Sequence, residues 1–305
     1  MIDPIRNAYL SIGVFDGVHL GHQAVVRDTV RMAAKARGAS VVLTFDPHPA
    51  VVLKKKKNVP LLTSTEEKRE LLLKMGADYV VVLGFSPELA TQSAAEFLGR
   101  VIIPRFEIKR LIVGEGFAMG KDRKGDVNEL RSIGLEYEFD VDEIPHAKLE
   151  KTRVSSTRIR RSLKDGRVSE AARFLGRDYF VRGVIVKGEG RGRQLGFPTA
   201  NLRLDPNRVL PTKGVYAVAV TKGSLRMKGV ANVGVRPTFG GKNLSVEAHI
   251  LDYEGDILGE TIQLDFIERL RPERRFKSEA SLRAAIVEDV HTARDILDAE
   301  MVRTS

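Results

Sequence analysis

Cysteine and tryptophan are both absent from this 305-residue sequence, and aromatic residues make up only 6% of it. Without cysteine the chain has no disulfide scaffold and no thiol nucleophile, whichever compartment it occupies. No apolar run approaches the roughly 20 residues that a membrane helix needs, and the N-terminus lacks the shape of a signal peptide. We therefore expect a cytoplasmic protein with no membrane partner, long enough for two domains that each bury a core.

Positive charge is abundant, because 50 lysines and arginines outnumber 40 aspartates and glutamates and leave a net charge of +10. Such a charge suits nucleic-acid binding, but the few aromatics and the lack of any RNA-recognition, zinc-finger or basic-zipper pattern disfavour it. The densest basic run, residues 54–57, is typical of a solvated loop. Excess positive charge also attracts polyphosphates. We expect small-molecule substrates and no nucleic-acid partner.

In the first part of the chain, up to about residue 175, short apolar runs alternate with helical patterns. Continuous apolar strands separated by helices are typical of a parallel sheet covered on both faces, so the sequence predicts an α/β domain over residues 1–175. The expected strands are 8–14, 40–45, 79–83, 111–113 and 135–141, and the expected helices are 21–37, 65–74, 94–101 and 126–133. Ligands of such sheets bind outside the carboxyl ends of the strands.

The pattern changes near Asp178, where short alternating strands punctuated by glycine and proline begin. This pattern predicts a small antiparallel β-barrel over residues 176–305, with the domain boundary between 165 and 180. The expected strands are 181–187, 215–221, 230–235, 245–251 and 261–266. A terminal helix over 278–301 is expected to pack on the barrel through a stripe of Leu282, Ile286 and Val290.

The first expected strand leads into residues 13–22, Gly-Val-Phe-Asp-Gly-Val-His-Leu-Gly-His, and then into a helix. A helix start presents unpaired N–H groups and a positive dipole end, which suit a phosphate. His19 and His22 can both reach such a phosphate and stabilise charge on its oxygens, while Gly21 lets the backbone approach. A solvated histidine pair or half of a zinc site is the alternative, but 0 Cys and 6 His offer few further zinc ligands.

Residues 153–160 open another helix, with hydroxyl residues where N-caps belong. An ordinary capped helix is one interpretation. The flanking Arg153 and Arg160 also fit a polyphosphate clamp, because guanidinium groups match phosphate oxygens.

Residues 188–201 form the main motif of the second half. Gly188, Gly190 and Gly192 make a pliable loop whose amides can wrap phosphates, and Arg191 and Arg193 add charge, although such loops are often only flexible. Further on, residues 246–249 follow a strand pattern that places Glu247 and His249 on one face. Glu247 is either a solvated charge or a base that deprotonates an attacking hydroxyl.

These motifs together resemble one family. Residues 19–22 resemble the HxGH signature of the nucleotidyltransferase superfamily, and the frame 13–22 resembles the bifunctional bacterial riboflavin kinase and FMN adenylyltransferase family, also called FAD synthetase. Residues 44–49 (TFDPHP), 155–160 (SSTxIR) and 198–201 (PTAN) resemble further segments of that family, in order and over nearly the whole chain. The stiff TFDPHP loop is expected to help wall the nucleotide and flavin pocket.

The resemblance implies a Rossmann-like nucleotidyltransferase domain that transfers AMP from ATP to FMN, which yields FAD and pyrophosphate. It implies a riboflavin kinase barrel that phosphorylates riboflavin with ATP, with Mg²⁺ as cofactor. Riboflavin, FMN and FAD are thus substrates or products, and ATP is the co-substrate.

The resemblance also implies roles for individual residues. His19, His22 and Glu247 are expected to be catalytic. Thr199 and Asn201 are expected to hold magnesium as well as nucleotide phosphates, since both carry oxygen ligands. Nucleotide and phosphate contacts are expected at Gly13, Phe15, Asp16, Gly21, Arg153, Ser155, Ser156, Thr157, Arg160, Gly188, Gly190, Gly192, Arg193, Thr199 and Asn201.

One position departs from the family pattern, because Gly116 stands where the family has Asp or Asn before a phenylalanine. We therefore expect an adenylyltransferase that works but is the weaker half. Residues 114–122 are not a P-loop, since the spacing of the glycines and the residue after the lysine do not match. Two alternatives stay open: a riboflavin kinase with a weak or non-catalytic nucleotide- or flavin-binding N-terminal domain, and a basic nucleic-acid-binding protein.

Overall fold

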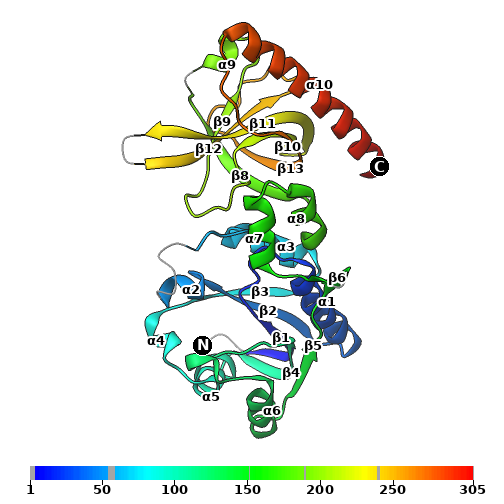
Figure 1. Ribbon diagram of the computed structural model, residues 1–305. Coiled ribbons are helices and arrows are strands. Elements are labelled where there is room, and N and C mark those ends of the chain that lie inside the picture. Colours follow the sequence, from blue (N-terminus) through cyan, green and yellow to red (C-terminus); the bar gives the residue numbers. More distant parts are fainter. Residues whose placement is uncertain (1–3, 54–58, 151, 189, 239–240, 305) are drawn as a thin grey trace. The chain divides into compact units, whose positions relative to one another are not determined.

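The computed structural model describes residues 4–53, 59–150, 152–188, 190–238 and 241–304. The chain forms two compact units, Met1–Ser156 and Thr157–Ser305, which are called here the first and second units. Each is built on its own β-sheet (Figure 1). In the described part of the chain, no helix combines the length and apolar character needed to span a bilayer. The basic run 54–57 falls outside the described residues.

A five-stranded parallel sheet forms the centre of the first unit, as predicted, with the strand order β3-β2-β1-β4-β5. Its strands are β1 (Ile5–Ile12), β2 (Ala39–Asp46), β3 (Tyr79–Gly84), β4 (Phe106–Gly114) and β5 (Asp140–Ile144). The chain adds β2 and β3 on one side of β1 and then β4 and β5 on the other. The carboxyl end of β1 therefore lies at a topological switch point, where open α/β sheets bind ligands.

Helices cover both faces of this sheet (Figure 1). Leu10 and Ile12 of β1 pack on the face covered by α5, η1 and α6, and Val42 of β2 packs with Val26 and Leu72 on the face of α1 and α3. Burial on both faces explains why the strand sequences are continuously apolar. The helices of this unit are α1 (Leu20–Lys35), α2 (Pro49–Val52), α3 (Thr65–Lys74), α4 (Pro87–Ala90), α5 (Ala94–Phe97), η1 (Leu98–Ile102), η2 (Lys121–Arg123) and α6 (Val127–Glu136).

The strand expected at 135–141 is wrong in its first half. Helix α6 continues to Glu136, and β5 begins only at Asp140. Leu135 is 86% exposed, so its apolar side chain is not buried in a sheet. The buried residues of α6, including Leu130 and Ile133, follow helical spacing instead.

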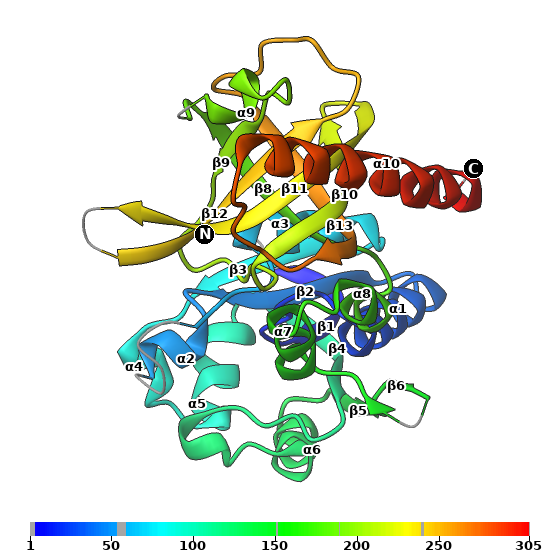
Figure 2. The same cartoon turned by 45° about the horizontal axis from the view of Figure 1, so that its top comes forward.

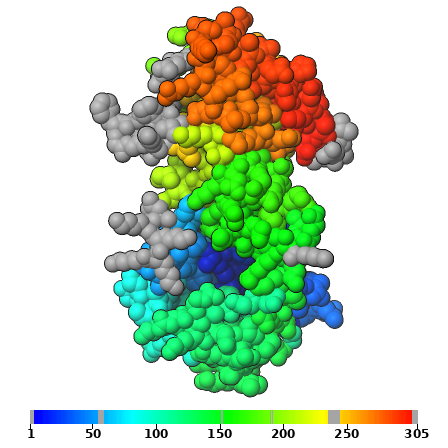
Figure 3. All heavy atoms as spheres, in the orientation of Figure 1, coloured from blue at the N-terminus to red at the C-terminus, as the bar shows by residue number. Residues whose placement is uncertain are grey.

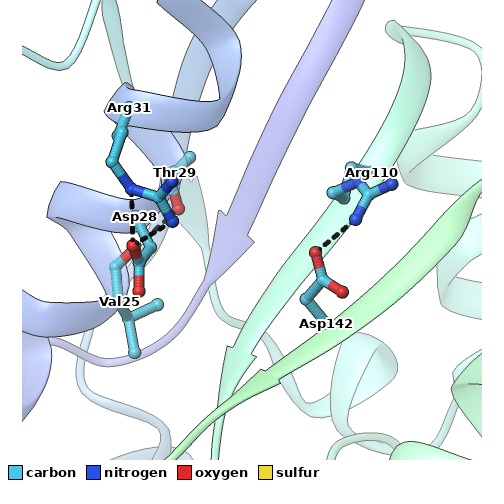
Figure 4. A network of polar contacts seen from close by, with 6 residues as sticks. All are labelled: Val25, Asp28, Thr29, Arg31, Arg110 and Asp142. Atoms are coloured by element: carbon cyan, nitrogen blue, oxygen red, sulfur yellow. Dashed lines mark hydrogen bonds and ion pairs between the residues drawn. The ribbon is translucent and has the colours of Figure 1, made fainter. Parts of the chain in front are cut away.

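Figure 4 shows two ion pairs of the first unit, one between β4 and β5 and one within α1. Arg110 of β4 contacts Asp142 and Asp140 of β5, both at 2.6 Å, while Arg31 contacts Asp28 within α1 at 2.7 Å. Each contact is partly exposed and contributes less than about 1 kcal/mol. The small hairpin of β6 (Lys148–Leu149) and β7 (Thr152–Arg153) follows β5.

The second unit is a closed antiparallel barrel with the order β10-β11-β12-β9-β8-β13. Its strands are β8 (Tyr179–Val186), β9 (Ala200–Arg203), β10 (Gly214–Lys222), β11 (Leu225–Thr238), β12 (Gly241–Ile250) and β13 (Thr261–Arg271). The predicted barrel is confirmed, and closure leaves no open sheet edge. Strand β9 was not predicted, because four residues are too few to show an alternating pattern.

Helix α10 (Glu279–Thr304) runs across the barrel strands (Figure 2) and lies on the surface of the second unit, shown in red in Figure 3. The predicted stripe of Leu282, Ile286 and Val290 is only half-buried. The buried line is shifted by one residue and consists of Ala285, Asp289, Ala293 and Leu297. The shift has a polar cause, since Asp289 accepts two hydrogen bonds from Arg271 of β13, at 2.8 and 2.7 Å.

Helices α7 (Ser156–Lys164) and α8 (Val168–Leu175) precede the barrel. The predicted helix after Arg153 is thus confirmed, whereas α8 was not predicted. Helix α8 packs against β8 and β13, and the backbone N–H of Thr212 donates to Leu163 O at 3.0 Å. By these contacts residues 157–175 group with the barrel. The domain boundary at 175/176 stays a prediction.

Candidate active sites

The turn after β1 brings His19 and His22 together at the start of α1. His19 is the N-cap of α1, and its Nδ1 accepts the backbone N–H of His22 at 3.3 Å. The two imidazole rings stack with their centroids 3.6 Å apart and their planes 17° from parallel. Because Nδ1 of His19 is an acceptor, a neutral His19 carries its proton on Nε2.

His22 is held in its neutral form. Burial lowers the pKa of His22 well below its ordinary value, and the neighbouring His19 and Lys68 lower this pKa further. Among the described residues, the buried Nδ1 of His22 has no hydrogen-bond partner. Buried polar atoms in folded proteins nearly always have partners, so an unsatisfied imidazole nitrogen at a helix start points to a ligand.

The motif residues around the two histidines fix the positions of the imidazole rings. A Cβ on Gly21 would lie 3.1 Å from Cε1 of His19, so a larger residue would displace the His19 ring. Phe15 is only 3% exposed and sets the edge of its ring against His22, with 5.3 Å between centroids. The ring of Phe15 also covers Gly13, where a Cβ would lie 3.0 Å away. The predicted nucleotide contacts of these residues stay predictions.

Asp16 ties the same turn to the segment before α3. Its carboxylate is buried, and Oδ1 accepts the backbone N–H groups of Leu62 at 2.9 Å and of Thr63 at 3.2 Å. In return, the hydroxyl of Thr63 accepts the N–H of Gly17 at 3.0 Å. Asp16 therefore fixes the turn to the segment before α3. Its role in nucleotide binding stays a prediction.

The motif at 155–160 meets the first turn at one described point. The hydroxyl of Ser156 donates to the carbonyl of Asp16 at 2.9 Å, although 140 residues separate the two. Ser155 is half-buried, and Arg153 is exposed on β7. The other two motif residues, the exposed Thr157 and the half-buried Arg160, lie on α7 and belong to the second unit.

Loops at the ends of β2 and β4 complete this edge of the sheet. His48, in the TFDPHP loop, caps α2 by accepting the N–H of Ala50 on Nδ1 at 3.1 Å. Gly116, after β4, has φ +69°, and its N–H donates to Glu143 at 3.0 Å. Because carboxyl ends of parallel strands share one edge, both loops lie at the same edge as the histidines.

Sequence reasoning missed Lys68 of α3. Its side chain is only 5% exposed, and its ammonium donates to Val14 O at 3.1 Å and to Phe45 O at 3.4 Å. In the sequence Lys68 stands among Glu67, Arg69 and other charged residues, which is the pattern of a solvated helix face. No local signal marks it as buried.

The second unit brings together three predicted site residues, Asn201 on β9, Glu247 on β12 and Thr199 just before β9. Asn201 of β9 lies directly opposite Glu247 of β12, and the hydroxyl of Thr199 donates to Oε2 of Glu247 at 3.4 Å. Asn201 is 5% exposed, while Glu247 is half-buried. Strand β9 is therefore the element that brings the PTAN motif to the glutamate.

The glycine-rich loop is shaped to fit these side chains. A Cβ on Gly188 would lie 2.0 Å from the amide nitrogen of Asn201, and one on Gly192 would lie 2.4 Å from Phe197 O and 3.1 Å from the Thr199 hydroxyl. Rather than a pliable loop, residues 191–197 form the short helix α9 (Arg191–Gln194) and a turn closed by Phe197 N–H to Gly192 O at 2.8 Å.

Two more predicted phosphate contacts lie on this loop. Gly190 has φ +75° and faces open space, and the side chain of Arg193 is exposed. Their predicted contacts with phosphate stay predictions.

His249 holds the PTAN motif from the side of β12. Its Nδ1 lies 2.8 Å from Pro198 O, and the ring of Phe197 meets its edge at 5.6 Å between centroids. Glu247 and His249 are half-buried and alternate with the buried Val246 and Ala248, so the predicted shared face is confirmed.

The donor atoms of the barrel site fit a hard cation. A hydroxyl, an amide and a carboxylate side chain lie together there, and magnesium prefers oxygen ligands and keeps waters and phosphates in its shell. Among the described residues, no group of three or more histidine or acidic side chains could hold a metal ion. Any cation at Thr199 and Asn201 would therefore need the oxygens of a phosphate ligand as well.

Comparison with known proteins matches each of the two units to a family. Residues 2–158 match the FAD synthetase family and residues 175–297 match the riboflavin kinase family. The bifunctional riboflavin kinase/FMN adenylyltransferase of Escherichia coli strain K12 is 36% identical over 293 residues, which covers 96% of this chain and 93% of that protein. The protein with the same name from Pseudomonas fluorescens is 37% identical over 290 residues, with 95% of this chain and 93% of that protein covered.

A solved structure described as a macrolide-efflux protein from Streptococcus pneumoniae is also similar. It has a TM-score of 0.87 and 32% identity, and the match covers 96% of this chain and 95% of that chain. The matched families, the relatives and the two folds agree with one another over most of the chain. The chain therefore belongs to the family of bifunctional riboflavin kinase/FMN adenylyltransferases, which are transferases.

Proposed function

We propose that the second unit phosphorylates riboflavin with ATP and that the first unit transfers AMP from a second ATP to the resulting FMN. The observation that supports this assignment is that several motif residues lie together in each unit, while Thr157 and Arg160 of the 155–160 motif belong to the second unit. His19 and His22 stack at the switch point of the sheet, where Ser156 binds the carbonyl of Asp16 in the same turn. Thr199, just before β9, and Asn201 of β9 lie beside Glu247 of β12.

In the kinase reaction a riboflavin hydroxyl attacks the γ-phosphorus of ATP, the bond to the β-phosphate oxygen breaks, and ADP leaves. Glu247 accepts the proton of the attacking hydroxyl, because it is the carboxylate beside the PTAN motif. The hydrogen bond from Thr199 orients that carboxylate. Thr199 and Asn201 would hold Mg²⁺, which when bound neutralises charge on the phosphates.

In the adenylyl transfer a phosphate oxygen of FMN attacks the α-phosphorus of ATP, and the bond to pyrophosphate breaks. No covalent enzyme intermediate is needed. The start of α1 and N–H groups of His19 and His22 stabilise charge on the α-phosphate oxygens. His22 donates one such N–H in its neutral form, so it adds no positive charge beside His19 and Lys68. Ser155, Ser156, Thr157 and Arg160 are assigned to the leaving pyrophosphate, as the family motif implies.

The alternative is a kinase whose first unit binds nucleotide or flavin with weak or no catalysis, and the specific observation behind it is Gly116. We further propose that the enzyme works in the cytoplasm and binds no nucleic acid. If weak binding to nucleic acid is measured and disappears between about 50 and 200 mM salt, the net positive charge of the protein explains it without a specific site.

Two single variants of the whole chain test the assignment. The proteins are incubated with ATP and magnesium and either riboflavin or FMN, and the flavins are then separated. We expect the wild type to make FMN and FAD from riboflavin, His22→Ala to stop at FMN, and Asn201→Ala to make FAD only when FMN is supplied.

The result discriminates between the proposals. FMN alone from the wild type favours the alternative. A His22→Ala protein that makes FAD at the wild-type rate removes the histidine pair from the mechanism. No flavin product at all would leave the nucleic-acid-binding hypothesis.

A further inference from the structure

Lys68 is a buried cation in the first unit and has no part in the mechanism above. It lies in the first half of α3, whose N-terminus is fixed by a capping box between Ser64 and Glu67. The side chain is 5% exposed, so its charge is largely removed from water. A buried ammonium is costly unless hydrogen bonds and opposite charges compensate for the lost hydration.

The hydrogen bonds of Lys68 join two neighbouring strand ends. Its Nζ donates to Val14 O, just after β1, at 3.1 Å and to Phe45 O, near the end of β2, at 3.4 Å. The hydroxyl of Thr44 donates to the same Val14 carbonyl at 3.0 Å. One cation therefore connects the turn that carries the histidines to the loop that begins at Asp46.

Opposite charges at the same edge complete the environment of Lys68. Burial lowers the pKa of Lys68, while the carboxylates of Asp16 and Asp46 raise it. Asp16 is itself bound to the backbone of Leu62 and Thr63. The segment 62–68 thus braces the turn at two points, through Asp16 and through the Val14 carbonyl.

The charge of Lys68 also reaches the reactive pair. The buried ring of Phe15, which follows Val14, supports the ring of His22. Lys68 is one of the charges that lower the pKa of His22, after burial and His19. Removal of the ammonium would therefore remove its hydrogen bond to Val14, next to Phe15. It would also raise the pKa of His22 and weaken the preference of His22 for its neutral form.

We propose that Lys68 is a positioning residue of the adenylyl-transfer site, which fixes the β1 turn against the end of β2 so that the two histidines face the α-phosphate correctly. The inference rests on the adenylyl-transfer site proposed above. A displacement of about 1 Å in such a site can cost about a hundredfold in rate. Because Lys68 touches no reacting atom, its effect acts through the backbone and through His22.

The test uses the whole chain with Lys68→Met, which keeps much of the length and removes the charge. We expect kcat for FAD formation from FMN to fall at least about tenfold, because the turn is no longer fixed. The rate of FMN formation from riboflavin serves as an internal control and should not change. Lys68→Arg should recover part of the FAD rate, since it restores a donor and the charge.

A matched control is Lys74→Met, since Lys74 is exposed at the end of the same helix. We expect it to keep wild-type rates. The second readout is an NMR titration of His22, whose pKa should move upward in Lys68→Met. A lysine that only stabilised the fold would lower FAD formation only in proportion to the unfolded fraction, and Lys68→Met would keep the wild-type kcat per folded molecule.

The outcomes separate this inference from the proposed function. If His22→Ala loses FAD formation while Lys68→Met keeps it within about twofold, Lys68 has no positioning role. If His22→Ala keeps FAD formation, the proposed site itself is wrong. Should Lys68→Met fail to fold, Lys68→Gln takes its place, since it keeps a donor and removes the charge, and a wild-type kcat for FAD formation in Lys68→Gln overturns the inference.

Discussion

Glu247 carries the kinase proposal at the scale of a single residue, since it lies opposite Asn201 and accepts a hydrogen bond from Thr199. Glu247→Gln keeps the shape and the hydrogen-bonding capacity but cannot accept a proton at neutral pH. We expect FMN formation to fall at least about a hundredfold, the lower end of the effect of losing a general base. ATP binding, measured by calorimetry, should persist.

Glu268→Gln is the matched control, because Glu268 is exposed on β13. It should leave FMN formation unchanged. Near-normal kinase turnover in Glu247→Gln would remove Glu247 from the mechanism.

Gly116 is the second residue whose chemistry can be tested alone. Its φ of +69° lies in the left-handed region, which asparagine and aspartate tolerate better than other side chains do. A Cβ there would have only the Nε2 of His146 within 4 Å, at 3.9 Å, so a polar side chain fits. A new hydrogen bond to a charged group is worth about 1.5 to 3 kcal/mol, part of which the strained φ offsets.

We therefore expect Gly116→Asn or Gly116→Asp to raise FAD formation about fivefold to tenfold and to leave the kinase rate alone. Gly116→Ala is the control, since it introduces at least as much backbone strain without a hydrogen bond, and it should give no gain. In the wild type FMN should accumulate before FAD. A wild-type protein that converts FMN as fast as it makes FMN would contradict this prediction.

At the scale of elements, we expect the stability of the pairing of β8 with β13 to depend on pH. Burial raises the pKa of Asp178, next to the start of β8, to about 6, and the carboxylates of Asp265 and Glu300 raise it while Arg226 lowers it. The unfolded value is about 3.9. Because the folded state holds the proton more tightly, stability falls as pH rises from about 4 to 6 and stays reduced above this range.

Asp178→Asn removes the charge that burial penalises. We expect the variant to be more stable than the wild type at pH 7.5, by about 1 kcal/mol after allowance for solvent screening, and nearly equal at pH 4. Hydrogen exchange of the β8 amides measures the difference. Asp205→Asn, at an exposed loop position, should show no such difference between the two pH values. Equal destabilisation by Asp178→Asn at both pH values would contradict the assignment.

At the scale of the whole molecule, the two units have separate cores. We predict that residues 176–305 fold alone and make FMN, as their match to the riboflavin kinase family from 175 onward supports. Residues 157–305 should also make FMN and be more stable, because they keep α8 on β8 and β13 and the bond from Thr212 to Leu163.

Thermal unfolding and FMN formation of the two fragments check this prediction. If residues 157–305 are active but 176–305 are insoluble, the domain begins at the first helix and the boundary at 175/176 is wrong. If both fragments fail while the whole chain works, the two units do not fold independently.

Features of the fold that leave a local signal could be predicted from the sequence. Apolar runs and helical spacing predicted the parallel sheet, the barrel and α10, since burial on one or two faces leaves a period in the residues. Contiguous motifs such as residues 13–22 and 198–201 identified the candidate sites in the same way. The short strand β9, helix α8 and the register of α10 left no clear period, and for α10 the pair of Arg271 and Asp289 decided the register.

Contacts between distant residues, in contrast, depend on how the whole chain packs. The hydrogen bond from Ser156 to Asp16 and the pairing of Asn201 with Glu247 depend on how the strands are ordered. In the sequence Lys68 has the pattern of a solvated charge. It is buried because the ends of two strands lie close together and both accept hydrogen bonds from its ammonium. Contacts between residues far apart in the chain leave no periodic trace in either segment, so the packing of the folded chain alone determines them.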